Sequence, residues 1–175
     1  MRAKTLSWLA AGLLAGPVTA GVVWLASAAG FVTLPGQAQQ YPGGQGRESD
    51  FTELLATAEQ TGGSIGVFRQ SIAPGSGPPA HVHHGEDEVL YVIDGSFKVK
   101  LGDRIIDAPA QSLIFVPRGT AHAFVNTGSA PGTLLVSVTP AGYEKYFAER
   151  AGVDAKKSAE LMKAHQTDVV GPPLK

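Results

Sequence analysis

The chain contains no cysteine, and this absence excludes two kinds of site. Without thiols there is neither a disulfide framework nor a thiolate zinc centre, so any bound metal must be held by histidine and carboxylate side chains. A surplus of positive charge is missing as well. The 14 Lys and Arg residues are balanced by 15 Asp and Glu residues, for a formal charge of −1. No basic surface therefore points to nucleic acid as a partner.

Internal repeats are absent too, which excludes a solenoid or propeller. Instead, 22 glycines and 12 prolines separate short runs rich in Val, Ile and Phe. This composition indicates an all-β fold with many turns. At 175 residues, the chain is expected to form one domain with tails. About 40 residues can be removed from the N-terminus and enough chain still remains to build one core.

Residues 1–38 are expected to form a signal peptide or an N-terminal membrane anchor. Arg2 and Lys4 precede an apolar stretch that carries no charge, and residues 6–34 are long enough to cross a bilayer as a helix. The two positive residues favour an orientation that keeps the N-terminus inside and sends the rest of the chain out. The alternative, a buried helix of a soluble protein, is less favoured because the stretch lacks a polar face.

Cleavage of a signal peptide would follow Ala28 or Ala38, each of which has a small residue two positions before it. The apolar stretch is longer than that of an ordinary signal peptide, so an uncleaved anchor remains equally open. In either case we expect the protein to be exported, to the periplasm or the extracellular space, either secreted or attached to a membrane through residues 6–34.

A polar, glycine-rich linker is expected over residues 39–50, a β barrel over residues 51–140 and a helical tail over residues 141–175. Residues 51–58 suit either a short helix or a first strand, and Asp94-Gly95 is a strong hairpin turn. Further strands are expected at residues 64–73, 86–93, 97–101, 104–107, 112–116, 121–126 and 133–139. Short strands in succession, with no helix between them, favour a sandwich or barrel. The tail is expected to pack on the barrel or on a second subunit.

Two histidines, His81 and His83, stand two residues apart in this β region. Alternate side chains of a strand leave the same face, with Cα atoms about 6.6–7 Å apart. Both imidazoles can therefore bind one divalent ion through Nε2, while His84 points to the opposite face. Glu88 is expected to start the next strand, folded back beside the first, and His122 to come from a strand across the barrel.

The carboxylate ligand is less clearly defined than the histidines, because Glu86 and Asp87 are close enough to Glu88 to compete with it. A single histidine in a strand is more often a core or surface residue than a metal ligand. The combination of His-x-His, a carboxylate five residues later and another histidine after Pro-x-Gly favours one metal site over that reading.

These residues resemble the two sequence motifs of the cupin superfamily. The first motif, G-x5-H-x-H-x3,4-E-x6-G, is matched by Gly75, His81, His83, Glu88 and Gly95. The second motif, G-x5-P-x-G-x2-H-x3-N, is matched by Pro117, Gly119, His122 and Asn126, with Gln111 in place of the opening glycine. The resemblance implies a double-stranded β-helix, the cupin jelly-roll barrel, with a metal inside that His81, His83, Glu88 and His122 hold. We expect Asn126 to cap a turn and not to contact a substrate.

One divalent transition metal is the expected cofactor. Iron, manganese, nickel and cobalt suit this ligand set and retain one or two positions for water, substrate or dioxygen, and zinc also fits although it is redox-inert. The expected pocket wall is apolar and consists of Phe68, Ile72, Val92, Phe115, Phe124 and Val136. Each of these residues taken alone is more often plain core. Together they suit an aromatic or enolic ligand better than a sugar phosphate.

Within the cupins, the chain resembles the single-domain group related to quercetin 2,3-dioxygenases. The similar segments are HVHHGEDEVLYVIDGSFKVKLGD, VPRGTAHAFVN, TPAGYEKYF and GPPL. The resemblance implies a dioxygenase that binds a flavonol or similar enol as its anion, opens the heterocycle with dioxygen and releases carbon monoxide. Glu88 would serve both as a ligand and as the proton acceptor, which requires a raised or labile basicity of its carboxylate.

Two other functions remain open at this point. One is a different cupin enzyme, an isomerase, a decarboxylase or a lyase, and the other is a non-catalytic exported domain that binds a metal or a small ligand. The fold alone does not separate them, because cupins carry many activities. The expected partners are a small-molecule substrate, dioxygen and a second copy of the chain in a homodimer, without nucleic acid.

Overall fold

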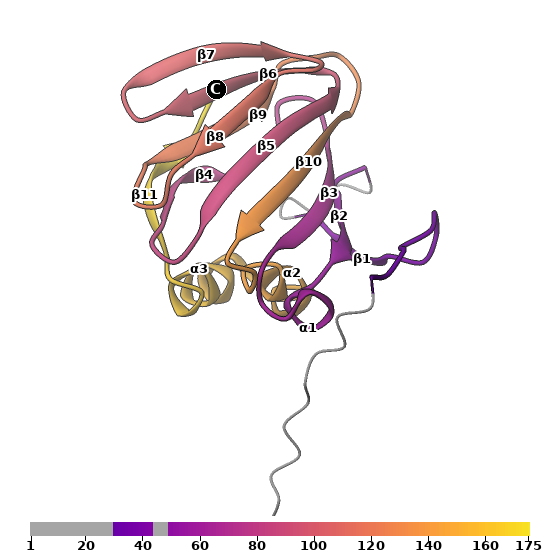
Figure 1. The fold of residues 1–175 in the computed structure, drawn as a ribbon. Helices are drawn as coiled ribbons and strands as arrows, with labels where there is room; N and C mark the ends of the chain where they lie inside the picture. Colours follow the sequence, from indigo (N-terminus) through magenta and orange to yellow (C-terminus); the bar gives the residue numbers. More distant parts are fainter. Residues whose placement is uncertain (1–29, 44–48) are drawn as a thin grey trace, which may run out of the picture.

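The computed structural model describes residues 30–43 and 49–175, and in this part of the chain two antiparallel sheets pack face to face (Figure 1). The first sheet has the order β1-β2-β3-β10-β5-β8 and the second the order β11-β4-β9-β6-β7. The strands of the first sheet are β1 (Gln39–Pro42), β2 (Phe51–Ala56), β3 (Gly66–Ile72), β10 (Gly132–Thr139), β5 (Asp87–Asp94) and β8 (Leu113–Val116). The all-β jelly-roll architecture is thereby confirmed.

The second sheet carries two of the histidine-bearing segments. Its strands are β11 (Thr167–Pro173), β4 (Pro79–His83), β9 (His122–Asn126), β6 (Ser96–Leu101) and β7 (Arg104–Pro109). Three short helices gather at one end of the two sheets, and they are α1 (Ala58–Thr61), α2 (Lys145–Glu149) and α3 (Ala155–Ala164) (Figure 1). Residues 51–58, left open between helix and strand, form mainly the strand β2.

The core lies between the inner faces of the two sheets. Along β10, every second side chain is buried, which is the pattern of a strand with one face against a core. Phe68 and Val136 come from the first sheet, Phe97 and Phe124 from the second, and the rings of Phe97 and Phe124 meet edge to face at 6.1 Å. Burying each such side chain contributes about 1.5–3 kcal/mol, so this layer holds the sheets together and fixes the strands that carry the candidate ligands.

The turn residues show why the second motif prefers particular residues, including a glycine at the position that Gln111 occupies here. Gln111 adopts φ 72°, a left-handed conformation that favours glycine, and this is why a glycine opens the motif. Its backbone N–H donates to Val92 O at 2.8 Å, which holds the turn in place. Asn126 donates to Ile72 O at 2.7 Å and to Ala130 O at 2.9 Å, so it stabilises loops as expected.

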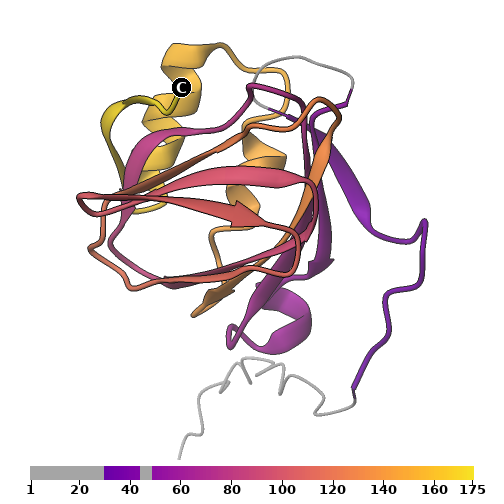
Figure 2. The same cartoon turned by 90° about the horizontal axis from the view of Figure 1, so that it is seen from above.

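The C-terminal tail contains the expected helices and also a strand that was not expected. Asp154 caps α3 by accepting the backbone N–H of Lys157 at 2.8 Å. After α3 the chain runs back along the second sheet, where β11 pairs with β4 and places Thr167 opposite His83 (Figure 2). The last part of β11 is the segment Gly171-Pro172-Pro173. It is accommodated because β11 is an edge strand, where prolines leave no ladder bond unmade.

The N-terminal predictions are only partly covered by the described residues. Gln39–Pro42, within the expected linker, pair with β2 as the edge strand β1. Residues 1–29, and with them most of the expected signal peptide or anchor, lie outside the described residues. Across residues 30–43 and 49–175, no helix combines the length and the apolar character that crossing a bilayer requires.

Candidate metal centre

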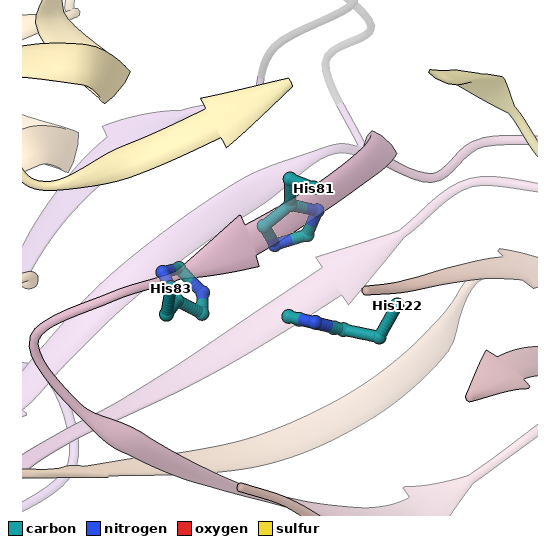
Figure 3. A group of neighbouring side chains, drawn as sticks. All are labelled: His81, His83 and His122. Atoms are coloured by element: carbon teal, nitrogen blue, oxygen red, sulfur yellow. The ribbon is translucent and has the colours of Figure 1, made fainter. Parts of the chain in front are cut away.

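Two neighbouring strands bring the three motif histidines together. His81 and His83 leave the same face of β4, and His122 begins β9 directly opposite His81 in the antiparallel ladder. All three side chains are buried. Their candidate ligand nitrogens lie within 4.8 Å of one another, and Figure 3 shows the three imidazoles around one shared space.

The partners of the histidines and of Glu88 differ from the expected arrangement. His122 was expected from across the barrel, but it lies on the neighbouring strand of the same sheet. Glu88 was expected beside the first strand, but β5 belongs to the facing sheet, so Glu88 approaches the histidines from the opposite side. The short connection between β4 and β5 crosses from one sheet to the other. As a result Glu88 faces the histidines from the opposite sheet, while His122 lies beside His81 in the same sheet. The four residues still meet in one place.

The hydrogen bonds of the histidines leave their inward nitrogens free to bind a cation. Nδ1 of His81 lies 2.8 Å from Pro79 O, and Nδ1 of His122 lies 3.1 Å from Thr120 O. A backbone carbonyl only accepts, so in the neutral rings the proton resides on Nδ1 and the lone pair on Nε2. Such partners fix the tautomer of metal-binding histidines.

His83 is oriented by the C-terminal strand. Its Nδ1 lies 2.8 Å from Thr167 Oγ1, and the Thr167 hydroxyl in turn donates to His165 O at 3.2 Å. Because the hydroxyl proton is used toward the carbonyl, the oxygen accepts the Nδ1–H of His83. The Nε2 lone pair of His83 then faces the shared space, as in the other two histidines.

Glu88 completes the set of candidate ligands. Its Oε2 lies 2.9 Å from His122 Nε2 and 3.9 Å from His83 Nε2. These three atoms are buried and lack a partner in hydrogen-bonding geometry, a state that costs about 1–3 kcal/mol for each atom unless something else binds them. Two ligands about 2.1 Å from one ion and at right angles to each other lie about 3.0 Å apart. The residues therefore fit a divalent metal.

The protonation states suit the same conclusion. Burial lowers the pKa of His81 to about 3, and the neighbouring His122 and His83 add to the effect, so the ring is neutral at physiological pH. Burial acts to raise the pKa of Glu88, but its contact with His122 outweighs this, with smaller contributions from His83 and His81, and the pKa falls to about 2. Burial acts to lower the pKa of His122, but the same contact with Glu88 raises it. Glu88 is thus ionised at neutral pH. Of the raised or labile basicity expected for its dual role, the raised alternative does not hold.

The other acidic residues of the motif face elsewhere. Asp87 accepts hydrogen bonds from the backbone and side chain of Arg118, which lowers its pKa to about 2. Glu86 Oε1 lies 2.9 Å from Nδ1 of His83, on the outer side of that ring. His84 pairs with Asp168 at 3.0 Å on the surface, as its opposite orientation predicts. Glu88 is therefore the carboxylate that the geometry places among the three histidines.

A cavity of about 690 Å³ adjoins this centre, with His81 and Glu88 in its wall. Of the expected wall residues, Phe68, Ile72 and Phe124 line the cavity. Val92 and Val136 are fully buried but belong to the core beside it. Volumes of about 300–1,000 Å³ are typical of small-molecule sites.

Phe115 does not belong to the cavity wall, contrary to the sequence-based prediction. Its side chain is 52% exposed on β8, because the alternation of this strand turns Ile114 and Val116 inward. The four residues Leu113–Val116 are all apolar, so the sequence carried no sign of which pair faces the core.

The C-terminal tail adds residues that sequence reasoning did not assign to the site. Tyr143 lines the cavity, and its ring meets that of His83 edge to face at 4.4 Å. Burial raises the pKa of Tyr143 well above its usual value, and Tyr146 and Glu88 add to the effect, so the phenol stays protonated. Arg150 lines the cavity as well. The sequence indicated a helical tail over residues 141–175 but not which part of the barrel the tail covers.

Comparisons with known proteins agree with this architecture. Residues 68–138 match the family model described as Cupin domain. Protein SchB of Streptomyces halstedii is 31% identical over 101 residues, which cover 57% of this chain and 72% of that protein. Acireductone dioxygenase of Sulfurihydrogenibium sp. is 42% identical over 72 residues, which cover 38% of this chain and 40% of that protein. The chain spans less than two thirds of the length of the acireductone dioxygenase and of three other curated relatives.

Among solved structures, an RmlC-like cupin from Shewanella frigidimarina superimposes with a TM-score of 0.56. The two proteins are 20% identical, and the match covers 67% of this chain and 96% of that one. At this identity the likeness concerns the fold. It agrees with the two face-to-face sheets.

Proposed function

Because the chain belongs to the cupin superfamily, we propose that it is a metal-dependent dioxygenase that acts on a flavonol-like or other enolic or aromatic small molecule. The similarity to an acireductone dioxygenase over 72 residues supports oxygen chemistry. The match covers less than half of that protein, so its substrate is not transferred to this chain.

One observation carries the proposal. Three buried imidazoles and the ionised Glu88 meet beside a cavity large enough for a small aromatic molecule, with His81 and Glu88 in its wall. A purely structural cluster of this kind would leave several buried polar atoms without partners. A site that holds a divalent ion beside a substrate cavity explains both the unpartnered atoms and the aromatic wall.

In the proposed reaction, His81, His83, His122 and Glu88 would hold the ion. When bound, a redox-active divalent metal supplies Lewis acidity toward an enol oxygen and access to dioxygen chemistry. Glu88 Oε2 would accept the enol proton, since the carboxylate is ionised and lies at the edge of the cavity. Its low pKa makes it a weak base, so the proposal requires that the enol proton be acidified when the substrate binds.

Other residues of the cavity would position the substrate. Phe68 and Phe124 exclude water and offer flat apolar surfaces to an aromatic ring. The Tyr143 hydroxyl stays protonated, and no residue in the described part of the chain forms a hydrogen bond with it. It would donate a hydrogen bond to a substrate oxygen.

The test is to load the metal-free protein in turn with iron, manganese, nickel and cobalt and to measure oxygen uptake on a panel of flavonols and other enols. We expect substrate-dependent uptake with at least one ion, and none in a His81→Ala/His122→Ala variant that keeps its fold. Conversion of a substrate without oxygen uptake would instead indicate an isomerase, a decarboxylase or a lyase. Metal retention without any conversion would favour a binding protein.

We further propose that the protein is exported, with residues 6–34 either removed as part of a signal peptide or retained as an anchor, and that it forms a homodimer. The apolar stretch and the two positive residues before it motivate the first statement. Cell fractionation with the mass of the mature chain tests export. Sedimentation equilibrium tests the dimer, and a monomer at micromolar concentration would contradict it.

A further inference from the structure

The cavity beside the metal centre also contains a cation from the C-terminal tail. Arg150 follows α2 immediately and lines the same cavity as His81 and Glu88. The side chain is half-buried, and its guanidinium carbon lies 5.6 Å from the centre of the Tyr146 ring and 5.7 Å from that of Phe147. Two aromatic rings thus hold the guanidinium in position.

Most hydrogen-bonding capacity of Arg150 is not used by the described residues. A guanidinium offers five N–H donors. One amino group donates to Pro42 O at 2.9 Å, and the buried Nε has no partner. Within residues 30–43 and 49–175, no carboxylate oxygen lies within 4.0 Å of the Arg150 nitrogens. A partly desolvated cation that finds no counter-ion among these residues is costly, so the position favours a ligand that brings a negative charge.

The acidic residues of the cavity wall are already engaged with other groups. Asp50 accepts hydrogen bonds from the backbone N–H of Ala73 and the hydroxyl of Ser76. Asp154 caps α3, and Glu88 lies against His122. These carboxylates therefore do not neutralise Arg150, even though they share the cavity with it.

We propose that Arg150 binds an anionic group of the substrate, so that the substrate is an aromatic or enolic acid. This inference rests on the proposed function, because it assigns a substrate class to the same cavity. A planar guanidinium matches a carboxylate with two parallel hydrogen bonds, and the unpartnered Nε lies beside the amino groups that would form them. The aromatic wall would hold the ring, and the metal centre would face its enol or phenol oxygen.

The test compares anions with neutral molecules of the same shape. Benzoate, salicylate and cinnamate are each paired with the corresponding carboxamide, and binding to the zinc-loaded protein is measured by calorimetry. Zinc itself attracts anions, so the decisive quantity is how much the ratio of acid affinity to carboxamide affinity changes in the Arg150→Met variant. Methionine keeps an apolar stem over the two aromatic rings. Arg104→Met, an exposed change of the same charge on β7, is the matched control.

In the wild type, at least one acid should bind about tenfold more tightly than its carboxamide, which is the strength of a charge-assisted hydrogen bond. The preference should fall to about twofold in Arg150→Met and persist in Arg104→Met. If Arg150→Met does not fold, Arg150→Gln takes its place with the same expectation. The inference is overturned if no acid is preferred, or if the preference is the same without Arg150.

Zinc is redox-inert, so these measurements involve no turnover. A protein that prefers acids through Arg150 but consumes no oxygen with any ion would support the inference and remove the dioxygenase. A protein that oxidises neutral enols without any preference for acids would support the dioxygenase and overturn the inference about Arg150.

Discussion

Replacing Thr167 by valine tests whether the C-terminal strand orients a metal ligand. Thr167 is 1% exposed on β11, and its hydroxyl accepts the Nδ1–H of His83 at 2.8 Å. Valine has nearly the same shape, so the substitution removes the hydrogen bond while the packing around it is kept. Without the acceptor, the His83 proton is no longer held on Nδ1, and the ring loses the partner that directs Nε2 at the ion.

The size of the effect follows from the groups around the His83 ring. Loss of such a supporting hydrogen bond typically weakens metal binding about 10- to 100-fold, or about 1.4–2.8 kcal/mol. Glu86 Oε1 lies 2.9 Å from the same nitrogen and can take over as acceptor. We therefore expect about tenfold weaker binding in Thr167→Val and about 100-fold weaker binding in the Thr167→Val/Glu86→Gln double variant.

The assay is competition for cobalt or zinc against a chelator of known affinity, with circular dichroism to establish that each variant is folded. Thr167→Ser retains the hydroxyl and is the matched control, with an affinity expected within about threefold of the wild type. Wild-type affinity in both Thr167→Val and the double variant would refute the reasoning, because it would mean that the ligand orientation does not depend on Nδ1 of His83.

Three further predictions concern stability. Phe97→Ala should lower the free energy of unfolding, measured by chemical denaturation, by about 3–5 kcal/mol because Phe97 fills the core. Phe115→Ala, on an exposed face, should lower it by less than about 1 kcal/mol. Equal losses would contradict the assigned faces. Glu144→Gln should cost about 2–3 kcal/mol, since the buried carboxylate accepts backbone N–H groups at 2.6 and 2.7 Å, and an unchanged melting transition would argue against this role. Arg118 lowers the pKa of Asp87 to about 2, so the stabilisation from the Arg118–Asp87 pair is present above about pH 4 and is lost as the pH falls toward 2. Asp87→Asn should flatten the pH dependence of the free energy of unfolding in this window. An unaltered slope would contradict the pairing.

The local features of the fold could be predicted from the sequence because they depend on nearby residues. Alternation along β10 and the turn at Asp94-Gly95 are visible in short segments. The spacing of the histidines indicated a metal site, and the resemblance to the cupin motifs assigned Glu88 as its carboxylate. Which sheet each strand joins was not visible, because a short connection after His83 can fold back in one sheet or cross to the other. The positions of Glu88 and His122 were exchanged for this reason.

The contribution of the tail could not be predicted for a related reason. Thr167 meets His83 across 84 residues, and no local pattern records such a contact. The sequence indicated a helical tail, but the part of the molecule that the tail covers depends on the tertiary fold. The side chain of Phe115 was misplaced because its strand has no polar residue to mark the outer face.

The most direct test of the central claim is the number of transition-metal ions bound per chain, measured by elemental analysis after dialysis of the wild type and of a His81→Ala/His83→Ala/His122→Ala variant. If the buried histidines hold one cation, the wild type retains one ion and the folded variant retains none. Retention of the same ion by the variant, or no retention by the wild type after loading with any of iron, manganese, nickel, cobalt or zinc, would contradict the account.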